Sequence, residues 1–488
     1  MKKQIFSIIF LTFSLSVLFA QTDDELFGGD DDFFTDDGIE VVEEVSAKSD
    51  LSKGTLFETG SIKIGGNFST SLTTMTTLYS DNSDNSGASG VQIASGVTST
   101  AGASTSSATS ANAESSATPS FKDNLYNTKL TPTASAYILV DARPSQTLRM
   151  YTKFGIAYPY TASATTRLDD YTTYGPTSAT TSITDWFTLK ELFTDFSIAD
   201  RAFFRFGLHT VTWGCGYFFS PVSDLINTSS INPEDTDAQV DGSLNLRTQI
   251  TFPGSQNCLW FYVIPSTDFI NQASAESYLR DTALAGKYEL VLGGWEFGLG
   301  GFWKYQNAPK AMVTASGSLK NISIFGEFVY RYGADSEWTA SSDWADKTNI
   351  IQATVGLSRY WKTPLITFAA QYYYDSNDKD MAHQYFTYGH NLAAILNFGR
   401  IFGKTDFTAN LFAMVNFGKE EMPALLKSYL SSYGFSSYLN SMTLSAMFNY
   451  SPISELKLGL GPYLTWESLE NKPVVSLKLT ATLGGGKF

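Results

Sequence analysis

The sequence predicts an all-β fold: a single transmembrane antiparallel β-barrel of about 18 strands, with 16 as the alternative count. Three observations support this prediction. Apolar and polar residues alternate in many short runs, short and long connections alternate along the chain, and aromatic residues are frequent (15%) while charged residues are few (17%). Soluble proteins carry about 25% charged residues, so a soluble fold of this length is disfavoured.

The C-terminal run shows the alternation most clearly. Val475, Leu477 and Leu479 are apolar, whereas Ser476 and Lys478 between them are polar. A period of two over about ten residues indicates a strand with one apolar and one polar face. The same reading along the chain predicts strands at 62–68, 133–140, 148–157, 185–196, 202–211, 243–252, 259–264, 282–292, 295–303, 311–317, 322–330, 351–359, 365–374, 391–399, 406–416, 442–450, 456–466 and 474–483.

The connections between these strands differ regularly in length. Short turns are predicted at 142–146, 199–200, 253–257 and 293–294. Long loops are predicted between them, at 69–120, 159–183, 213–241, 265–281, 332–347, 375–387 and 418–438, with one short exception at 306–309. Short periplasmic turns and long extracellular loops are the rule for outer-membrane barrels, which fixes the expected orientation.

The N-terminus predicts export. Residues 1–20 have two lysines followed by an apolar run and Ala20, the pattern of a cleavable signal peptide. Residues 21–55 form an acidic segment that we expect to be disordered in the periplasm, because twelve acidic residues and one lysine lie within 21–50. The barrel is then expected to span 56–488, and its location is the bacterial outer membrane. Beyond Ala20 no apolar stretch is long enough for a transmembrane helix.

Enzymatic chemistry is not expected. The chain has three histidines, His209, His383 and His390, and the spacing of the last two matches no metal motif. We therefore predict no catalytic residue, no metal and no cofactor, and the absence of a basic aromatic platform predicts no nucleic-acid partner. Cys215 and Cys258 are expected near opposite ends of the barrel wall, so a disulfide is not expected.

The alternation also predicts which side chains face the lumen. Where apolar residues face lipid, their neighbours face inward. On this basis, five cations on neighbouring strands are predicted to form one pore-lining basic patch: Arg149, Lys153, Arg201, Arg205 and Arg247. Such a patch favours anions, unless the cations pair with carboxylates on an infolded loop; both readings stay open.

The stretch from Arg205 to Asp224 resembles a motif of porin-like outer-membrane families. The pattern consists of a glycine, a Trp-Gly pair, an aromatic residue, a proline and an aspartate, matched here by Gly207, Trp213, Gly214, Phe219, Pro221 and Asp224. In such families this loop folds near the channel. The resemblance implies a constriction loop that contains Trp213, Gly214, Gly216, Pro221, Asp224, Glu234, Asp235 and Asp237.

The terminal Phe488 carries a second resemblance. Bacterial outer-membrane barrels often end on an aromatic residue that the barrel assembly machinery reads, so we expect Phe488 to be an assembly signal. With the loop motif, the chain resembles the large-barrel porins, including alginate-export-type channels, and the acidic segment is also similar to spirochaete outer-membrane proteins.

The expected function is passive diffusion of small polar solutes, anions among them, through the outer membrane. The expected partners are outer-membrane lipids, the assembly machinery and small solutes, and the sequence leaves the oligomeric state open. Two alternatives remain: a surface adhesin or structural barrel with a long Ser/Thr-rich extracellular loop, and a transporter of hydrophobic ligands.

Overall fold

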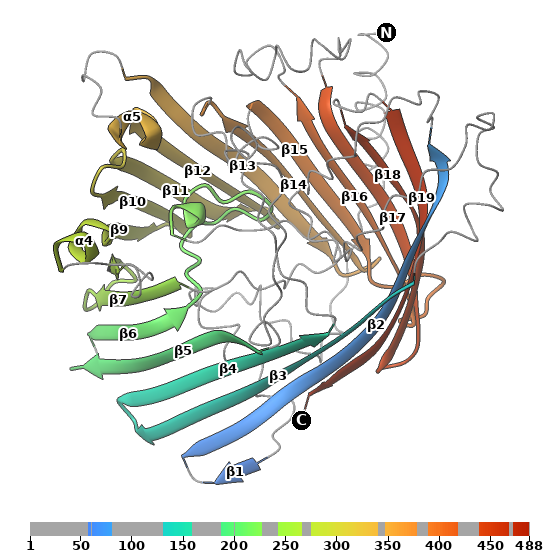
Figure 1. The fold of residues 1–488 in the computed structure, drawn as a ribbon, viewed down its shortest axis with the longest axis horizontal. Coiled ribbons are helices and arrows are strands. Elements are labelled where there is room, and N and C mark those ends of the chain that lie inside the picture. Colours follow the sequence, from blue (N-terminus) through green and yellow to red (C-terminus); the bar gives the residue numbers. More distant parts are fainter. Residues whose placement is uncertain are drawn as a thin grey trace, which may run out of the picture.

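Eighteen strands, β2 to β19, form a closed antiparallel ring in the computed structural model (Figure 1). The structure describes residues 57–59, 61–80, 130–158, 187–199, 201–226, 243–265, 275–339, 347–377, 389–417, 439–467 and 472–487. Each strand pairs with its neighbours in the chain, and β19 pairs with β2 to close the ring. The predicted barrel of 18 strands is confirmed.

The strands match the eighteen predicted runs in order. Their bounds are β2 (Ile62–Ser80), β3 (Leu130–Ser145), β4 (Leu148–Tyr158), β5 (Phe187–Ile198), β6 (Ala202–His209), β7 (Ser243–Thr251), β8 (Cys258–Ile264), β9 (Ala283–Leu292), β10 (Trp295–Lys304), β11 (Lys310–Leu319), β12 (Ile322–Tyr332), β13 (Asn349–Trp361), β14 (Ile366–Asp375), β15 (Gly389–Phe398), β16 (Phe407–Phe417), β17 (Leu439–Ile453), β18 (Leu456–Glu467) and β19 (Lys472–Lys487). A short additional strand, β1 (Phe57–Thr59), pairs with β2.

Within the described ranges, helical structure is confined to connections. The described helices are η4 (Ser223–Leu225), α4 (Ala275–Arg280) and α5 (Asp335–Thr339). None of the helices in the described ranges has the length and apolar character needed to cross a membrane.

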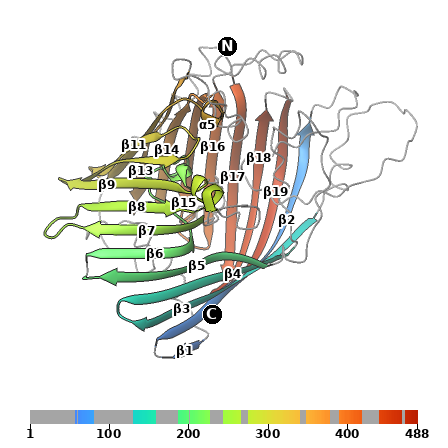
Figure 2. The ribbon, with the colours of Figure 1, turned by 60° about the vertical axis from the view of Figure 1, so that its left-hand side comes forward.

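The strands at and beside the closure of the ring are long. β2 has 19 residues and β19 has 16, whereas about ten residues suffice to cross a bilayer. The ladder between β2 and β19 joins the first and last strands of the ring, with Leu483 opposite Thr70 and Val475 opposite Tyr79. Closure pairs the backbone groups that an open sheet edge would expose, and it tilts the strands around the ring (Figure 2).

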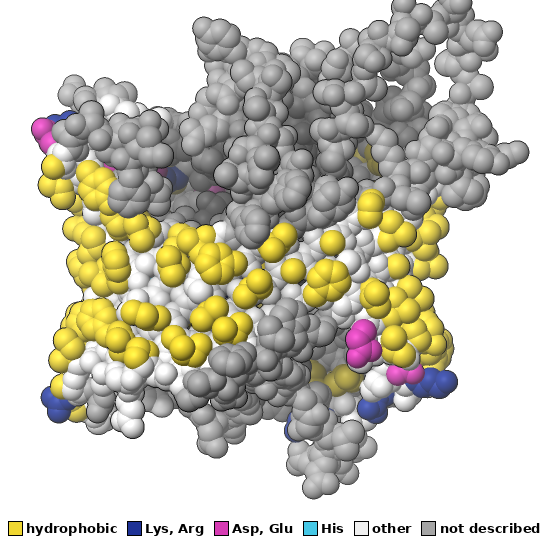
Figure 3. Space-filling view, turned by 60° about the horizontal axis from the view of Figure 1, so that its bottom comes forward, with side chains coloured by type: hydrophobic (Ala, Val, Ile, Leu, Met, Phe, Trp, Pro, Cys, Tyr) yellow, Lys and Arg dark blue, Asp and Glu magenta, His cyan; other side chains and the backbone are white. Residues whose placement is uncertain are grey.

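The outer face of the ring carries an apolar belt. Figure 3 shows hydrophobic side chains around the middle of the barrel, with charged side chains near its lower rim. Phe154, Phe206, Leu299 and Leu479 are exposed members of this belt. Because side chains alternate along a strand, the neighbours of these residues point inward and form the inner wall.

Several sequence-based expectations fall outside the described residues. The signal peptide (1–20), the acidic segment (21–55) and Phe488 are among them, as is the Ser/Thr-rich stretch on which the adhesin alternative depends. The predicted turn at 293–294 is confirmed, because β10 follows β9 after Gly293 and Gly294. The turn predicted at 142–146 lies at 146–147 instead, because β3 continues to Ser145.

Candidate functional site: the inner wall and the inserted segment

The chain that follows β6 folds into the ring. We call residues 210–226 the inserted segment; Figure 1 shows it running from the end of β6 into the interior. Val211 and Val222 are fully buried, and Trp213 is 4% exposed. The indole Nε1 of Trp213 donates a hydrogen bond of 2.6 Å to the carbonyl of Val222, which closes the segment into a compact loop.

Glu327 is the main polar anchor of this segment. Its side chain lies on the inner face of β12 and is 3% exposed. One carboxylate oxygen accepts the backbone N–H groups of Cys215 (2.5 Å) and Gly216 (2.6 Å) and the hydroxyl of Ser220 (2.9 Å). The other accepts the N–H of Val222 at 2.9 Å. Hydrogen bonds to an ionised acceptor are stronger than those between neutral groups. The Glu327 side chain therefore holds two parts of the loop together, residues 215–216 and residues 220–222.

Two glycines permit this approach. A Cβ at Gly214 would collide with the Ser220 hydroxyl and with the Glu327 carboxylate. A Cβ at Gly216 would collide with the carbonyl oxygen of Phe219. The Gly-Cys-Gly sequence therefore lets the backbone contact the carboxylate directly.

Gln371 on β14 is the second anchor. Its Oε1 accepts the N–H groups of Tyr217 (3.0 Å), Phe218 (2.6 Å) and Phe219 (3.2 Å), and its Nε2 donates to the carbonyl of Phe219. The Phe219 ring stacks on Tyr373 at 5.2 Å between centroids. The segment is thus attached to the inner wall by hydrogen bonds and by aromatic packing.

A third anchor comes from β9. The ammonium group of Lys287 donates a 2.6 Å hydrogen bond to the carbonyl of Trp213 and also forms an ion pair with Glu289. Sequence reasoning did not identify Lys287, Glu327 or Gln371 as anchors. The available signal was a polar residue in the middle of a largely apolar strand, as in ISIFGEFVY.

The structure brings four of the five predicted patch residues to the inner face of neighbouring strands. Arg149 pairs with Asp141 at 2.9 Å and with Asp195 at 3.6 Å. Arg205 pairs with Asp195 at 2.6 Å through its Nε, and its Nη2 donates to the second oxygen at 3.0 Å. Carboxylates on β3 and β5 therefore alternate with these guanidinium groups around the wall.

The other two cations lie over aromatic rings. Arg247 lies over Trp260 at 5.4 Å, and Lys153 lies over Tyr137 at 5.1 Å. Lys153 is also directly opposite Glu191 in the β4–β5 ladder. Both cations are buried. We name the four inward cations, Arg149, Lys153, Arg205 and Arg247, the basic cluster.

Arg201 is not part of this cluster. It lies in the turn between β5 and β6 and is exposed, because β5 ends at Ile198 and β6 begins only at Ala202. The positive φ of Ala199 (54°) ends the extended backbone at this point. The predicted inward orientation of Arg201 is therefore wrong, since the alternation was extended past the end of the strand.

Of the four predicted loop acids, the described residues contain one, Asp224. Asp224 is exposed in η4, and Glu234, Asp235 and Asp237 lie outside the described ranges. Trp213, Gly214, Gly216 and Pro221 all lie in the inserted segment, and their role in a constriction stays a prediction. The carboxylates that pair with Arg149 and Arg205, Asp141 and Asp195, come from the wall itself.

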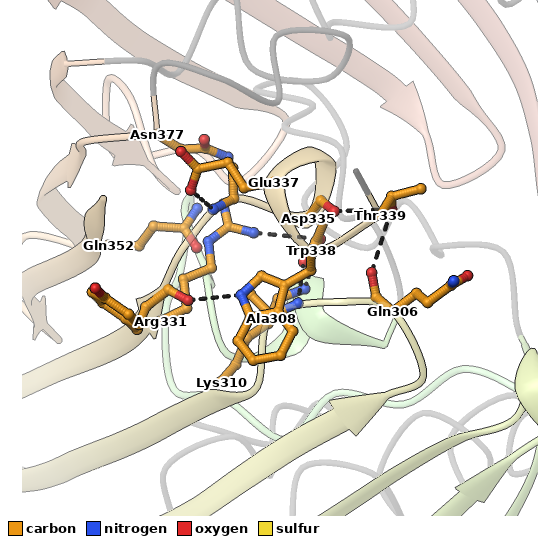
Figure 4. A network of polar contacts seen from close by, with 12 residues as sticks. Gln306, Ala308, Lys310, Arg331, Asp335, Glu337, Trp338, Thr339, Gln352 and Asn377 are labelled. Carbon is orange, nitrogen blue, oxygen red and sulfur yellow. Dashed lines mark hydrogen bonds and ion pairs between the residues drawn. The ribbon is translucent and has the colours of Figure 1, made fainter. Parts of the chain in front are cut away.

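A second polar network joins two connections at the barrel rim (Figure 4). Asp335, at the start of α5, accepts the N–H of Ala308 (3.0 Å) and pairs with Lys310 (3.1 Å) and Arg331 (3.4 Å). Thr339 donates to the carbonyl of Gln306 at 3.3 Å. The connection at 305–309, which was the short exception in the sequence, is therefore covered by α5.

The described histidines and cysteines have structural surroundings. His209 is buried beside Phe193, His390 stacks on Phe417, and neither cysteine is in a disulfide. Across the described ranges, no group of three or more His, Cys, Asp or Glu side chains is placed to hold a metal. His383 lies outside these ranges.

Cys215 provides a test of the inserted position. Burial, together with the nearby Glu327 carboxylate, raises the pKa of the Cys215 thiol to about 12. The thiolate is the reactive form, so at pH 8 we expect iodoacetamide to alkylate Cys215 at least about 100-fold more slowly than an ordinary thiol. Mass spectrometry of the Cys258→Ser variant, folded and urea-unfolded, measures this directly. Alkylation of the folded protein at the unfolded rate would contradict the inserted position.

The chain was compared with known proteins at the level of sequence and of structure. No protein-family model matches the sequence, and neither does any curated protein. Among solved structures, Pseudomonas aeruginosa OccK11 (OpdR) matches with a TM-score of 0.47 and 8% identity, over 89% of this chain and 98% of the other. P. aeruginosa OpdK matches with a TM-score of 0.47 and 7% identity, over 89% and 100%.

A third match is the outer-membrane channel DcaP of Acinetobacter baumannii. It has a TM-score of 0.44 and 8% identity, and the match covers 88% of this chain and 99% of DcaP. Identities this low carry no information on the solute.

Proposed function

We propose that this protein is an outer-membrane channel through which small polar solutes diffuse passively. The observation that carries the proposal is a closed 18-strand ring with an apolar outer belt and a polar inner wall, into which one segment is inserted and anchored. An apolar outside suits lipid, and a polar inside suits water and solutes.

The inserted segment supports the channel reading because it is held at defined places. Anchors on β9, β12 and β14 place it against the inner wall rather than on the rim. A segment fixed in this way reduces the cross-section of a barrel without filling it by a separate domain.

The arrangement of charges argues against strong anion selectivity. Arg149 pairs with Asp141 and Asp195, Arg205 pairs with Asp195, and Lys153 is opposite Glu191. Paired charges of opposite sign largely cancel beyond about one Debye length, roughly 8 Å at physiological salt. We therefore propose a channel for polar solutes with weak charge preference. The signal peptide, the disordered acidic segment and the role of Phe488 in assembly remain parts of this proposal.

Reconstitution of the purified full-length protein into planar lipid bilayers tests the proposal. We expect stepwise insertion of channels with ohmic current in 1 M KCl and a reversal potential close to zero in a KCl gradient. Membranes that stay silent at every voltage, with protein that is folded by circular dichroism, would refute the channel function.

A further inference from the structure

Hydroxyl side chains gather on the inner wall where β19, β2 and β3 close the ring. Phe68 and Leu72 are exposed on the outer face, so Ser69, Ser71 and Thr73, which alternate with them along β2, point inward. The ladders then place Thr480 opposite Thr73 and Thr482 opposite Ser71. On the other side of β2 they place Ser71 opposite Thr133 and Ser69 opposite Ser135. We name this set the hydroxyl patch: Ser69, Ser71, Thr73, Thr133, Ser135, Thr480 and Thr482.

The hydroxyl patch is more accessible than the charged part of the wall. Each of its seven residues is partly exposed. Arg205, Arg247 and Lys287, by contrast, are 5%, 7% and 5% exposed. A solute in the lumen therefore meets hydroxyl groups of the patch more readily than these three cations.

Local contacts show that these hydroxyls share one surface. Ser71 Oγ and Thr133 Oγ1 are 2.5 Å apart, so one donates to the other. Gly459 on β18 lies opposite Thr480, and a Cβ at that position would collide with the Thr480 hydroxyl. The glycine therefore leaves space for the hydroxyl on the inner side. Lys457, opposite Thr482, and Lys478 border the patch.

One acceptor beside the patch has no donor in the structure. Asn67 precedes Ser69 on the same face of β2, and its Oδ1 is buried without a hydrogen-bond partner among the described residues. A buried acceptor that lacks a donor is costly, because no hydrogen bond offsets its desolvation.

The inserted segment is anchored away from the patch. Its described anchors are on β9, β12 and β14, and Phe218 contacts Phe412 on β16. The strands β19, β2 and β3 lie on the opposite part of the ring (Figure 1). The patch and the segment therefore face each other across the lumen.

We propose that the hydroxyl patch is the solute-binding wall of the channel and that its ligands are uncharged polyhydroxylated solutes. A hydroxyl both donates and accepts, and it rotates to suit its partner, so a grid of hydroxyls matches the successive hydroxyls of a polyol in several positions. An uncharged solute also loses little solvation on leaving water, compared with an ion. Many weak equivalent sites suit permeation, which requires a solute to enter and also to leave.

This inference depends on the proposed channel function, and its test separates the two. Proteoliposomes that contain the full-length protein are assayed for influx of sorbitol and of gluconate, which differ by one carboxylate, and for K⁺ conductance. A quadruple variant of the hydroxyl patch, which we call the track variant, combines Ser71→Ala, Thr73→Val, Thr480→Val and Thr482→Val. These substitutions remove hydroxyls with little change of side-chain shape. We expect sorbitol to enter faster than gluconate in the wild type, and the variant to lose about fivefold in sorbitol influx with K⁺ conductance within about twofold.

Two matched controls accompany the track variant. Thr70→Val with Thr74→Val removes hydroxyls from the outer face of the same strand and is expected to leave both fluxes unchanged. Thr73→Ser with Thr480→Ser keeps the inner hydroxyls and is expected to retain sorbitol influx, which guards against a folding defect. Equal losses in the outer-face control, or unchanged sorbitol influx in the track variant, would overturn the inference. Absence of K⁺ conductance in the wild type would instead refute the channel function.

Discussion

Glu327→Gln is expected to release the inserted segment from the wall. The amide keeps one acceptor oxygen, but its NH₂ group replaces the other. The replaced oxygen is either the one that accepts the N–H of Val222 or the one that accepts the N–H groups of Cys215 and Gly216. A buried donor left facing another donor costs about 1–3 kcal/mol. A cost of 1.4 kcal/mol corresponds to about a tenfold shift in the equilibrium between anchored and released segment.

Single-channel recording measures this release. We expect larger and noisier open currents in Glu327→Gln, together with faster alkylation of Cys215. Glu296→Gln is the matched control, because Glu296 is an acid on β10 that is partly buried and makes no described hydrogen bond to the inserted segment. If both variants keep wild-type current noise and alkylation rate, Glu327 does not hold the segment.

The double variant Asp141→Asn, Asp195→Asn is expected to turn a weakly selective channel into an anion-selective one. These two carboxylates pair with Arg149 and Arg205. Guanidinium groups stay protonated at any usable pH, so removing two negative charges leaves two uncompensated positive charges on the wall. Their field raises the local anion concentration, and it is screened within about 3 Å at 1 M salt.

Reversal potentials in a KCl gradient measure this change in ion selectivity. At low salt we expect a shift toward the chloride equilibrium potential that fades near 1 M. Asp406→Asn removes a carboxylate from an exposed turn between β15 and β16 and is expected to leave the potential unchanged. An unchanged potential in the double variant would mean that permeating ions do not sense the basic cluster.

The fold was predictable because its physical cause is local. Alternation of apolar and polar residues specifies both the strand and its lipid-facing side, as in the run from Val475 to Leu483. Eighteen such runs were found from sequence, and eighteen strands form the ring. The length of β2, 19 residues, was underestimated because its second half is rich in threonine and lacks a clear apolar period.

The wall was predictable only in part. Alternation gave the inward direction of Arg149, Arg205 and Arg247, but it failed at Arg201, where a turn had already ended the strand. The partners of the cluster were missed because Asp195 lies ten residues from Arg205 in sequence and meets it only through the register of β5 and β6. The anchors Glu327 and Gln371 are more than a hundred residues away in sequence from the inserted segment that they bind, and no local pattern encodes such a contact.

Cysteine accessibility during single-channel recording tests most directly that the inner face of this ring lines a conducting path. Thr480 and Leu479 are neighbours on β19, one inward and one exposed on the outer belt. Addition of a water-soluble, sulfonate-bearing thiol reagent to the Thr480→Cys variant is predicted to produce discrete drops in current, while the Leu479→Cys variant stays unaffected. Current that drops in Leu479→Cys and persists in Thr480→Cys would contradict the account.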